Sequence, residues 1–186
     1  KNKITAWLTL TTKSLVNHLD AIRLLKIGFE QLRFDEKDRI VELLQQRKTR
    51  WQSRISGSGH SYAMQTASRQ HSALALRDYH NTGLGALNWL IELVSKIEKD
   101  PAEYDLLIDE LKRIHRVLLQ APKQFLLVCE EPQSEHLIEE IQNVWDKLAV
   151  DSAPVALTQV EKVTHDQHEA WLIQANVQFC AAAYPA

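Results

Sequence analysis

The sequence predicts an α+β fold that is helix-rich and contains a small mixed sheet. Three segments have the features of strands, at residues 3–12, 124–129 and 170–183, and most of the sequence between them has the three- and four-residue apolar spacing of amphipathic helices. This order is typical of helices packed on a layer of strands. A length of 186 residues with 45% hydrophobic residues is sufficient for one substantial core.

The three strands are predicted from two kinds of pattern. Residues 3–12 alternate, which is the period of a half-buried strand, and one face carries Ile4, Ala6, Leu8 and Leu10. The run from Phe125 to Cys129 is continuously apolar, which is typical of a strand covered on both faces. Alternation returns from Trp171 to Phe179.

The first helices are predicted from their apolar stripes and end signals. One stripe runs from Leu15 to Phe29. Asp35 can cap the next helix, which continues to the Ser56-Gly57-Ser58-Gly59 break. An alanine-rich helix is predicted after the break, and its small side chains would allow close packing on a neighbour: Ala63, Ala67, Ala73 and Ala75.

Three more helices follow in the second half. A strong stripe from Leu87 to Ile97 comes after Gly83 and Gly85. Asp100-Pro101-Ala102-Glu103 combines an N-cap, a proline at the first helical position and an acidic residue that can reach back, so it predicts a helix start. That helix stops at Ala121-Pro122, and Pro132 begins the last one, which extends to Leu148. Residues 149–164 lose this periodicity and are predicted to form a linker.

Composition narrows the possible partners and compartments. The formal net charge of −2 gives no general attraction for a polyanion, and the basic residues between Arg47 and Arg54 spread over more than one helix face. Neither a membrane-spanning run nor a secretory start is present. Cys129 and Cys180 are interpreted as free core cysteines, so we expect a cytoplasmic or organelle-matrix location. The absence of an initial methionine predicts a fragment of a larger chain.

No set of residues in the sequence predicts a complete active site. Residues 165–169 read His-x-x-His-Glu between a loop and a strand, and we interpret them as an exposed polar turn. His60 is interpreted as a histidine at a helix start that bonds to backbone or Tyr62. The Gly57-x-Gly59 pair lacks the other residues of a phosphate loop, and the nearby serines have no His-acid pair. We therefore predict no catalytic, cofactor-binding or metal-binding residue.

Four stretches in a fixed order suggest a family. Gly57-Ser58-Gly59-His60-Ser61-Tyr62-Ala63 precedes Gly83-Leu84-Gly85 and a second helical run. The strand-to-helix turn at Leu8–Leu15, the acidic helix at Asp38–Leu44 and the segment Glu169–Cys180 are the other matches. Together they resemble the C-terminal half of the presequence-protease branch of the pitrilysin and insulinase-like zinc metallopeptidases.

The resemblance implies a domain organisation and a function. Residues 1–150 would be a segment of the third domain, residues 151–168 a linker and residues 169–186 the first strand of the following domain. Such enzymes hydrolyse peptides with a zinc motif, His-x-x-Glu-His, that this sequence lacks. The implied role is a non-catalytic part of the wall of a chamber that admits unfolded peptides. Zinc would belong to the parent enzyme, with none bound by this segment.

The implied partners are the N-terminal catalytic half of the same protein and the peptide substrates of the parent, without nucleic acid or membrane. Self-association is also expected, through the strand of Trp7 and Leu8 or that of Trp171 and Ile173, because excision would expose strand edges. Two alternatives remain at this point. One is a stand-alone helical scaffold that binds a partner protein through an apolar groove, and the other is a small hydrolase assembled from scattered residues.

Overall fold

The computed structural model describes residues 8–15, 18–145, 168–173 and 176–184. The described residues fall into two compact units. The first unit contains residues 36–105 and the described residues between 168 and 184, and the second contains the remainder of the described chain. Helices account for 68% of the described residues, and none of those residues is in a strand.

The predicted α+β class with a small mixed sheet is therefore wrong for the described part of the chain. Residues 8–12, 124–129 and the described part of 170–183 have neither helix nor strand structure. The rest of the first predicted strand, residues 3–7, lies outside the described residues. A strand exists only when a neighbour completes its hydrogen-bond ladder, and alternation of side chains does not supply that neighbour. Leu126 and Val128 are 91% and 89% exposed, so the run around them is not covered on both faces.

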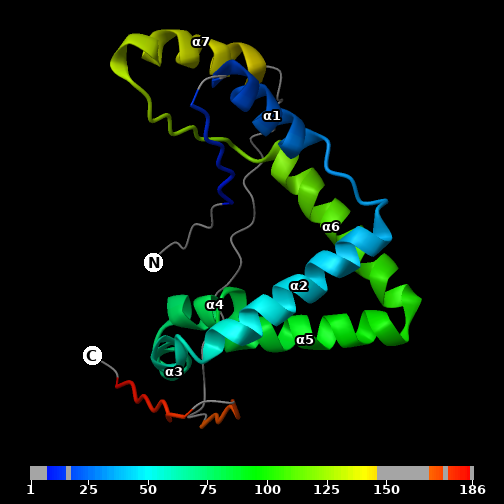
Figure 1. Cartoon of the computed structure of the whole chain (residues 1–186), viewed down its shortest axis with the longest axis vertical. Helices are drawn as coiled ribbons and strands as arrows, with labels where there is room; N and C mark the ends of the chain where they lie inside the picture. Colours follow the sequence, from blue (N-terminus) through cyan, green and yellow to red (C-terminus); the bar gives the residue numbers. More distant parts are fainter. Residues whose placement is uncertain (1–7, 16–17, 146–167, 174–175, 185–186) are drawn as a thin grey trace. The chain divides into compact units, whose positions relative to one another are not determined.

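The first unit is built around helix α5 (Leu84–Lys99), which packs against α2 (Lys37–Ile55) and α4 (Ala73–Asn81) (Figure 1). The stripe predicted for this helix is confirmed, because Leu87, Leu90 and Val94 are almost fully buried. Helix α5 begins at Leu84, directly after Gly83, as the glycine break predicted. The hydrophobic core cluster of this unit consists of four buried residues, Ile55, Tyr79, Leu84 and Leu87.

The predicted alanine-rich helix is two helices. Helix α3 (Gly59–Ser68) ends before residues 69–72, and α4 starts at Ala73. The break has a local cause that the alanine spacing does not reveal: the Ser72 hydroxyl accepts a hydrogen bond from the Ala75 amide, which caps a new helix. Helix α3 packs on α4 and is tied to α2 by the Trp51 indole, which donates to the Tyr62 hydroxyl at 2.9 Å.

The second unit pairs α1 (His18–Glu30) with α7 (Ser134–Trp145), which follows a short 3₁₀ turn, η1 (Glu131–Gln133). Ile22 and Leu137 are buried in this unit, and the rings of Phe29 and Trp145 lie 5.7 Å apart. An ion pair of 2.9 Å joins Arg23 to Glu140 across the two helices. The apolar stripes predicted for the two helices are confirmed at these positions. The first stripe is wrong at its start, because Leu15 precedes α1 and is 96% exposed.

The interpretation of the cysteines as core residues is wrong. Cys129 and Cys180 are both free and exposed. They lie in the segments that fail to form strands, so no facing sheet or helix buries them.

Among the helices that the structure describes, none is both long and apolar enough to cross a membrane.

Helix α6 (Pro101–Gln120) begins where the sequence predicts. The Asp100 carboxylate accepts a hydrogen bond of 2.9 Å from the Ala102 amide, and Pro101 occupies the first helical position, where its missing N–H costs nothing. The start of this helix is thus fixed by three consecutive residues.

We expect Asp100→Ala to lower the free energy of unfolding by about 1 kcal/mol, because an amide at the helix start loses its acceptor. Urea denaturation followed by circular dichroism measures the change. Asp105→Ala, an exposed position one turn further along, is the matched control and should stay close to wild type. Equal losses in the two variants would contradict the capping role.

Candidate functional site

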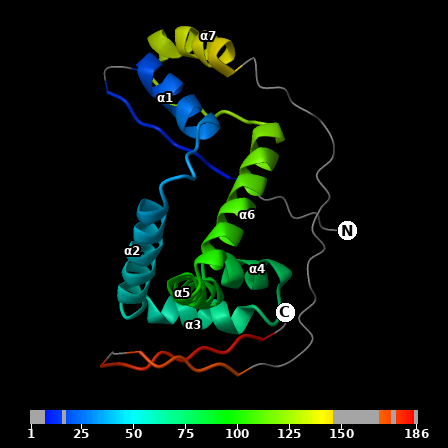
Figure 2. The same ribbon diagram turned by 90° about the vertical axis from the view of Figure 1, so that its right-hand side faces the viewer.

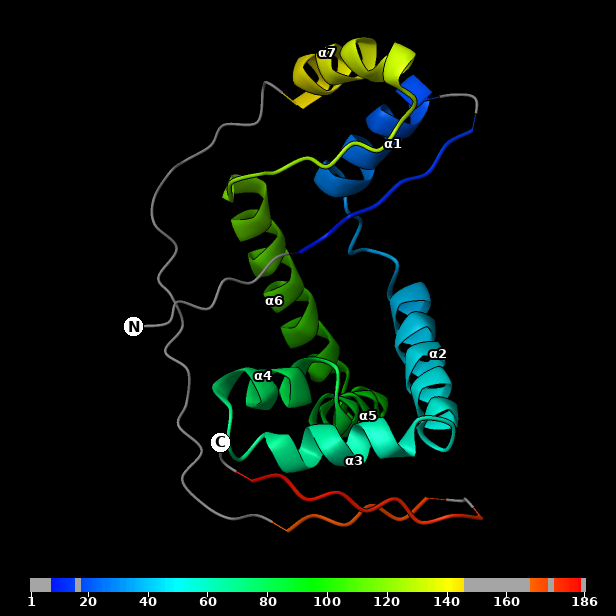
Figure 3. The same cartoon turned by 90° about the vertical axis from the view of Figure 1, so that its left-hand side faces the viewer.

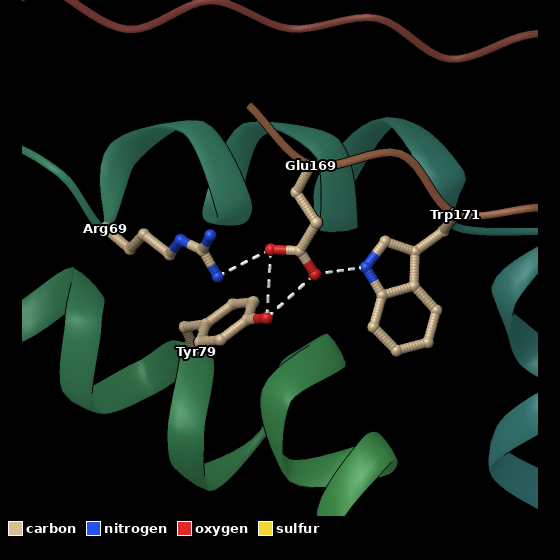
Figure 4. A network of polar contacts seen from close by, with 4 residues as sticks. All are labelled: Arg69, Tyr79, Glu169 and Trp171. Atoms are coloured by element: carbon tan, nitrogen blue, oxygen red, sulfur yellow. Dashed lines mark hydrogen bonds and ion pairs between the residues drawn. The ribbon is translucent and has the colours of Figure 1, made fainter. Parts of the chain in front are cut away.

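A polar network in the first unit surrounds the carboxylate of Glu169 (Figure 4). Arg69 Nη1 lies 2.6 Å from Glu169 Oε2, and the Tyr79 hydroxyl donates at 2.9 Å to Oε1 and 3.1 Å to Oε2. The indole N–H of Trp171 donates to Oε1. We call these four residues the Glu169 clasp.

Each residue of the clasp is placed by a different local feature. Arg69 is the C-cap residue of α3, and Tyr79 lies in the last turns of α4. Glu169 and Trp171 belong to the described residues 168–173 and 176–184, which we call the C-terminal segment. One residue separates Glu169 from Trp171 in this irregular part of the chain, and the Trp171 indole donates to the Glu169 carboxylate. The clasp therefore fastens one end of the chain to two helices.

The side chains of the clasp are largely withdrawn from water. Arg69 and Tyr79 are each 7% exposed, and the side chain of Glu169 is 21% exposed. The Arg69 guanidinium also lies 4.2 Å from the centre of the Tyr79 ring, so a cation–π contact adds to the ion pair. Removing two charges from water is costly unless the remaining polar positions are satisfied. Three donors around one carboxylate meet that requirement.

Burial raises the pKa of the Tyr79 phenol above its ordinary value of 10.0, and the hydrogen bond to Glu169 raises it further. Both causes favour the protonated phenol, because a phenolate would lose its hydration and face the negative carboxylate. The nearby Arg69 acts in the opposite direction with a smaller effect. Tyr79 is therefore held as a hydrogen-bond donor and is not prepared to act as a base.

The C-terminal segment also rests on apolar contacts. Trp171 and Ile173 pack against the core cluster, and the ring of Phe179 lies against Gly59. The His71 ring nitrogen Nε2 is 2.9 Å from the carbonyl oxygen of Ala183. Figures 2 and 3 show the segment running along α3 on the side away from α5. Charge, apolar packing and shape together hold it there.

The glycines of the sequence pattern are explained by close approach. A Cβ on Gly83 would lie 2.8 Å from the Tyr79 Cα, and one on Gly85 would enter the Tyr79 ring. A Cβ on Gly59 would enter the ring of Phe179. None of the described glycines has a positive φ angle, so space and not backbone conformation demands them. They allow α4, α5 and the C-terminal segment to meet closely.

The residues considered from the sequence are not brought together into a reaction centre. Residues 165–167 lie outside the described residues. The carboxylate of Glu169 is bound in the clasp, so the interpretation as an exposed polar turn misses the role of this side chain. His60 is exposed at the start of α3, and Tyr62 is bonded to Trp51 instead. Among the described residues, no three His, Cys, Asp or Glu side chains are placed to hold a metal ion.

A surface hollow of about 500 Å³ lies in the second unit between α1 and the start of α7, with His18, Asp20, Arg23 and His136 in its lining. The Arg23 guanidinium is already paired with Glu140, so its charge is not directed at a ligand. The hollow therefore has the polar groups of an ordinary helix surface. We assign no cofactor to it.

The described residues combine helices in close contact at glycines with a clasped C-terminal segment, and they contain no recognisable reaction centre. Comparison with known families identifies the chain further. The chain belongs to a peptidase-associated family, the one described for subfamily C of the M-16 peptidases, whose model matches residues 1–93, half of the 186 residues. The match contains the glycine signature and confirms the resemblance found in the sequence. No curated protein and no solved structure matches the chain.

Arg69 and Tyr79 were not predicted as site residues, although they lie within the matched half. The match ends inside α5, so Glu169 and Trp171 lie outside it. Ninety residues separate Tyr79 from Glu169, and no spacing rule connects positions so far apart. The only sequence signal for the clasp was Arg69, a charged residue at the end of an alanine-rich helix.

We expect Gly83→Ala to destabilise the first unit by about 1–3 kcal/mol, because the added methyl meets the backbone of Tyr79, which cannot move without shifting α4. Gly57→Ala is the matched control, since its added methyl makes only an ordinary contact with the Arg54 carbonyl. Thermal and urea unfolding measure both. A Gly83→Ala protein as stable as Gly57→Ala would show that the close approach is not required.

A second expectation concerns pH. Because the pKa of Tyr79 is higher in the folded chain than when unfolded, its contribution to stability is fully present below about pH 10 and is lost as pH rises through the folded value. We expect the free energy of unfolding to decline less steeply above pH 10 in Tyr79→Phe than in wild type. Urea titrations from about pH 8 to about pH 11.5 test this. Parallel profiles would exclude a raised pKa at this position.

Proposed function

We propose that this chain is a non-catalytic segment from the C-terminal half of a zinc-dependent metallopeptidase that degrades unfolded peptides. In this role it contributes to the wall of the substrate chamber. The observation that carries the proposal is the family match over residues 1–93, which contains the glycine signature. The family is one associated with peptidases, so a peptidase is the natural parent.

The tight packing of the first unit supports the proposed role in the wall of a substrate chamber. Its helices are held by contacts that leave no room for a single methyl group at Gly83 or Gly85. Tight interiors of this kind resist deformation. The clasp then fixes the C-terminal segment, which we propose opens the next domain, to the helices of the preceding one. A rigid junction between successive domains would keep the size of an enclosed chamber constant.

The catalytic chemistry is assigned to the parent. Zinc and its ligands would be supplied by the N-terminal catalytic half, which would be the main partner of this chain. The peptide substrates of the parent would be the second partner, and the cytoplasm or an organelle matrix the location. Residues 1–150, 151–168 and 169–186 remain the proposed third-domain segment, linker and start of the next domain.

Exposed apolar side chains support a role within a larger protein. Leu15, Leu126, Val128 and Leu172 are all at least 89% exposed. Large side chains that a parent covers would be uncovered when the segment stands alone. The same exposure would also suit the alternative function, a stand-alone helical scaffold that binds a partner protein.

We expect the isolated chain, supplied with zinc and an unstructured peptide, to show no chelator-sensitive hydrolysis above a protein-free control. A parent protein containing this chain should hydrolyse the peptide, and replacing the glutamate of its His-x-x-Glu-His motif by glutamine should abolish turnover. Liquid chromatography of the peptide products measures all three. Chelator-sensitive turnover by the isolated chain would contradict the proposal, and a parent without the motif would favour the scaffold.

A further inference from the structure

The described residues of the first unit come from two separate parts of the sequence. Helices α2 to α5, which we call the platform, are contiguous, whereas the C-terminal segment returns to them only after the residues of the second unit. The segment has neither helix nor strand structure in its described residues. It therefore lies on the platform as an extended peptide ligand would, held by contacts between side chains.

Those contacts have the form of a linear recognition motif. Glu169, Trp171 and Ile173 are spaced by two residues, which places their side chains on one side of an extended chain. Glu169 pairs with Arg69 and accepts from Tyr79, and these two residues form what we call the seat for the carboxylate. The two apolar residues pack against the core cluster. Further along, Phe179 meets the glycine gap at Gly59. Each anchor of the segment has a matching feature on the platform.

The seat for the carboxylate is organised by the platform itself. The Arg69 guanidinium is stacked on the Tyr79 ring. The backbone of Tyr79 lies against Gly83 and its ring against Gly85, so both glycines fix its position. Arg69 and Tyr79 both come from the platform, and these contacts do not involve the C-terminal segment. Binding groups arranged in advance lower the entropy cost of binding a ligand.

We propose that the platform of one chain binds the C-terminal segment of a second copy in place of its own, giving a dimer in which the two segments are exchanged. Every contact of the clasp is preserved in such a dimer, and exchange of an identical element is a low-cost route to dimers. Residues 146–167 connect α7 to the segment, and a chain of that length can reach at most about 75 Å. Binding within one chain competes through its high effective concentration, so the dimer should form at high protein concentration.

Charge reversal provides the test. In Arg69→Glu the clasp faces two carboxylates, and in Glu169→Arg it faces two guanidinium groups, so neither variant can close the clasp within one chain or with its own kind. In a mixture, an exchanged dimer brings opposite charges together at both clasps. At one clasp, Glu169 of the first variant is seated on Arg69 of the second, and at the other the two introduced side chains meet with opposite charges. We expect an equimolar mixture to give a species of twice the monomer mass that contains one copy of each, detected by native mass spectrometry with one variant tagged.

Two controls distinguish exchange of the C-terminal segment from nonspecific association. The chain carrying both substitutions can close its clasp internally and should have the monomer–dimer distribution of wild type. The exposed ion pair between Glu110 and Arg113 on α6 is the matched control, since mixing Glu110→Arg with Arg113→Glu should give no enrichment of mixed dimer. Absence of the mixed dimer from the clasp mixture, with both variants as helical as wild type by circular dichroism, would overturn the proposal.

A second measurement uses the unmodified chain and decides the question if either variant loses its helices. Sedimentation over a concentration series should show a twofold rise in mass that excess synthetic peptide of residues 168–184 reverses. The same peptide with Glu169→Gln and Trp171→Ala should have no effect. A wild-type chain that stays monomeric throughout, or a dimer that the native peptide leaves intact, would overturn the exchange.

Discussion

The structure of the first unit depends on the burial of one tyrosine. Tyr79 presents its backbone to Gly83, its ring to Gly85 and the Arg69 guanidinium, and its hydroxyl to Glu169. A phenol can serve both a tight apolar contact and a hydrogen bond because its two ends differ in polarity. The residue thereby fixes the distance between α4 and α5, and its hydroxyl fixes the C-terminal segment. Loss of either contact would loosen the other.

The energetics of the clasp are those of a partly buried ion pair whose hydrogen-bonding positions are satisfied. An ion pair removed from water contributes little stability by itself, because desolvation opposes the attraction of the charges. In the clasp, the carboxylate accepts from Tyr79 and Trp171 as well as pairing with Arg69. Its main effect is therefore specificity of placement: another segment without an acidic residue at that position would leave Arg69 buried without Glu169.

Membership of a peptidase-associated family suggests a purpose for this placement. The clasp joins a helical unit, which begins within the family match, to a segment beyond it. Under the function proposed above, a junction of this kind would hold neighbouring parts of the parent protein in a fixed relation. The exposed apolar residues of the irregular segments, such as Leu126 and Leu172, are consistent with further surfaces meeting there.

The sequence by itself determined the features that depend on neighbouring residues. The start of α6 follows from Asp100 and Pro101, and the start of α5 from the glycine break, because caps and stripes act within one or two helical turns. The family was also visible in the order of short motifs. The break between α3 and α4 was equally local, at Ser72, but was hidden by regular alanine spacing.

Only the tertiary structure decided whether the extended segments would pair and where Glu169 would lie. A strand needs a ladder partner and a carboxylate withdrawn from water needs donors, and both are supplied by residues far away in the chain. Alternation around Leu8 and Leu172, and the apolar run around Leu126, could not show that no strand ladder forms in the described residues there. Tyr79 and Glu169 meet across ninety residues, and that meeting is decided by how α3 and α4 pack, which no local pattern encodes.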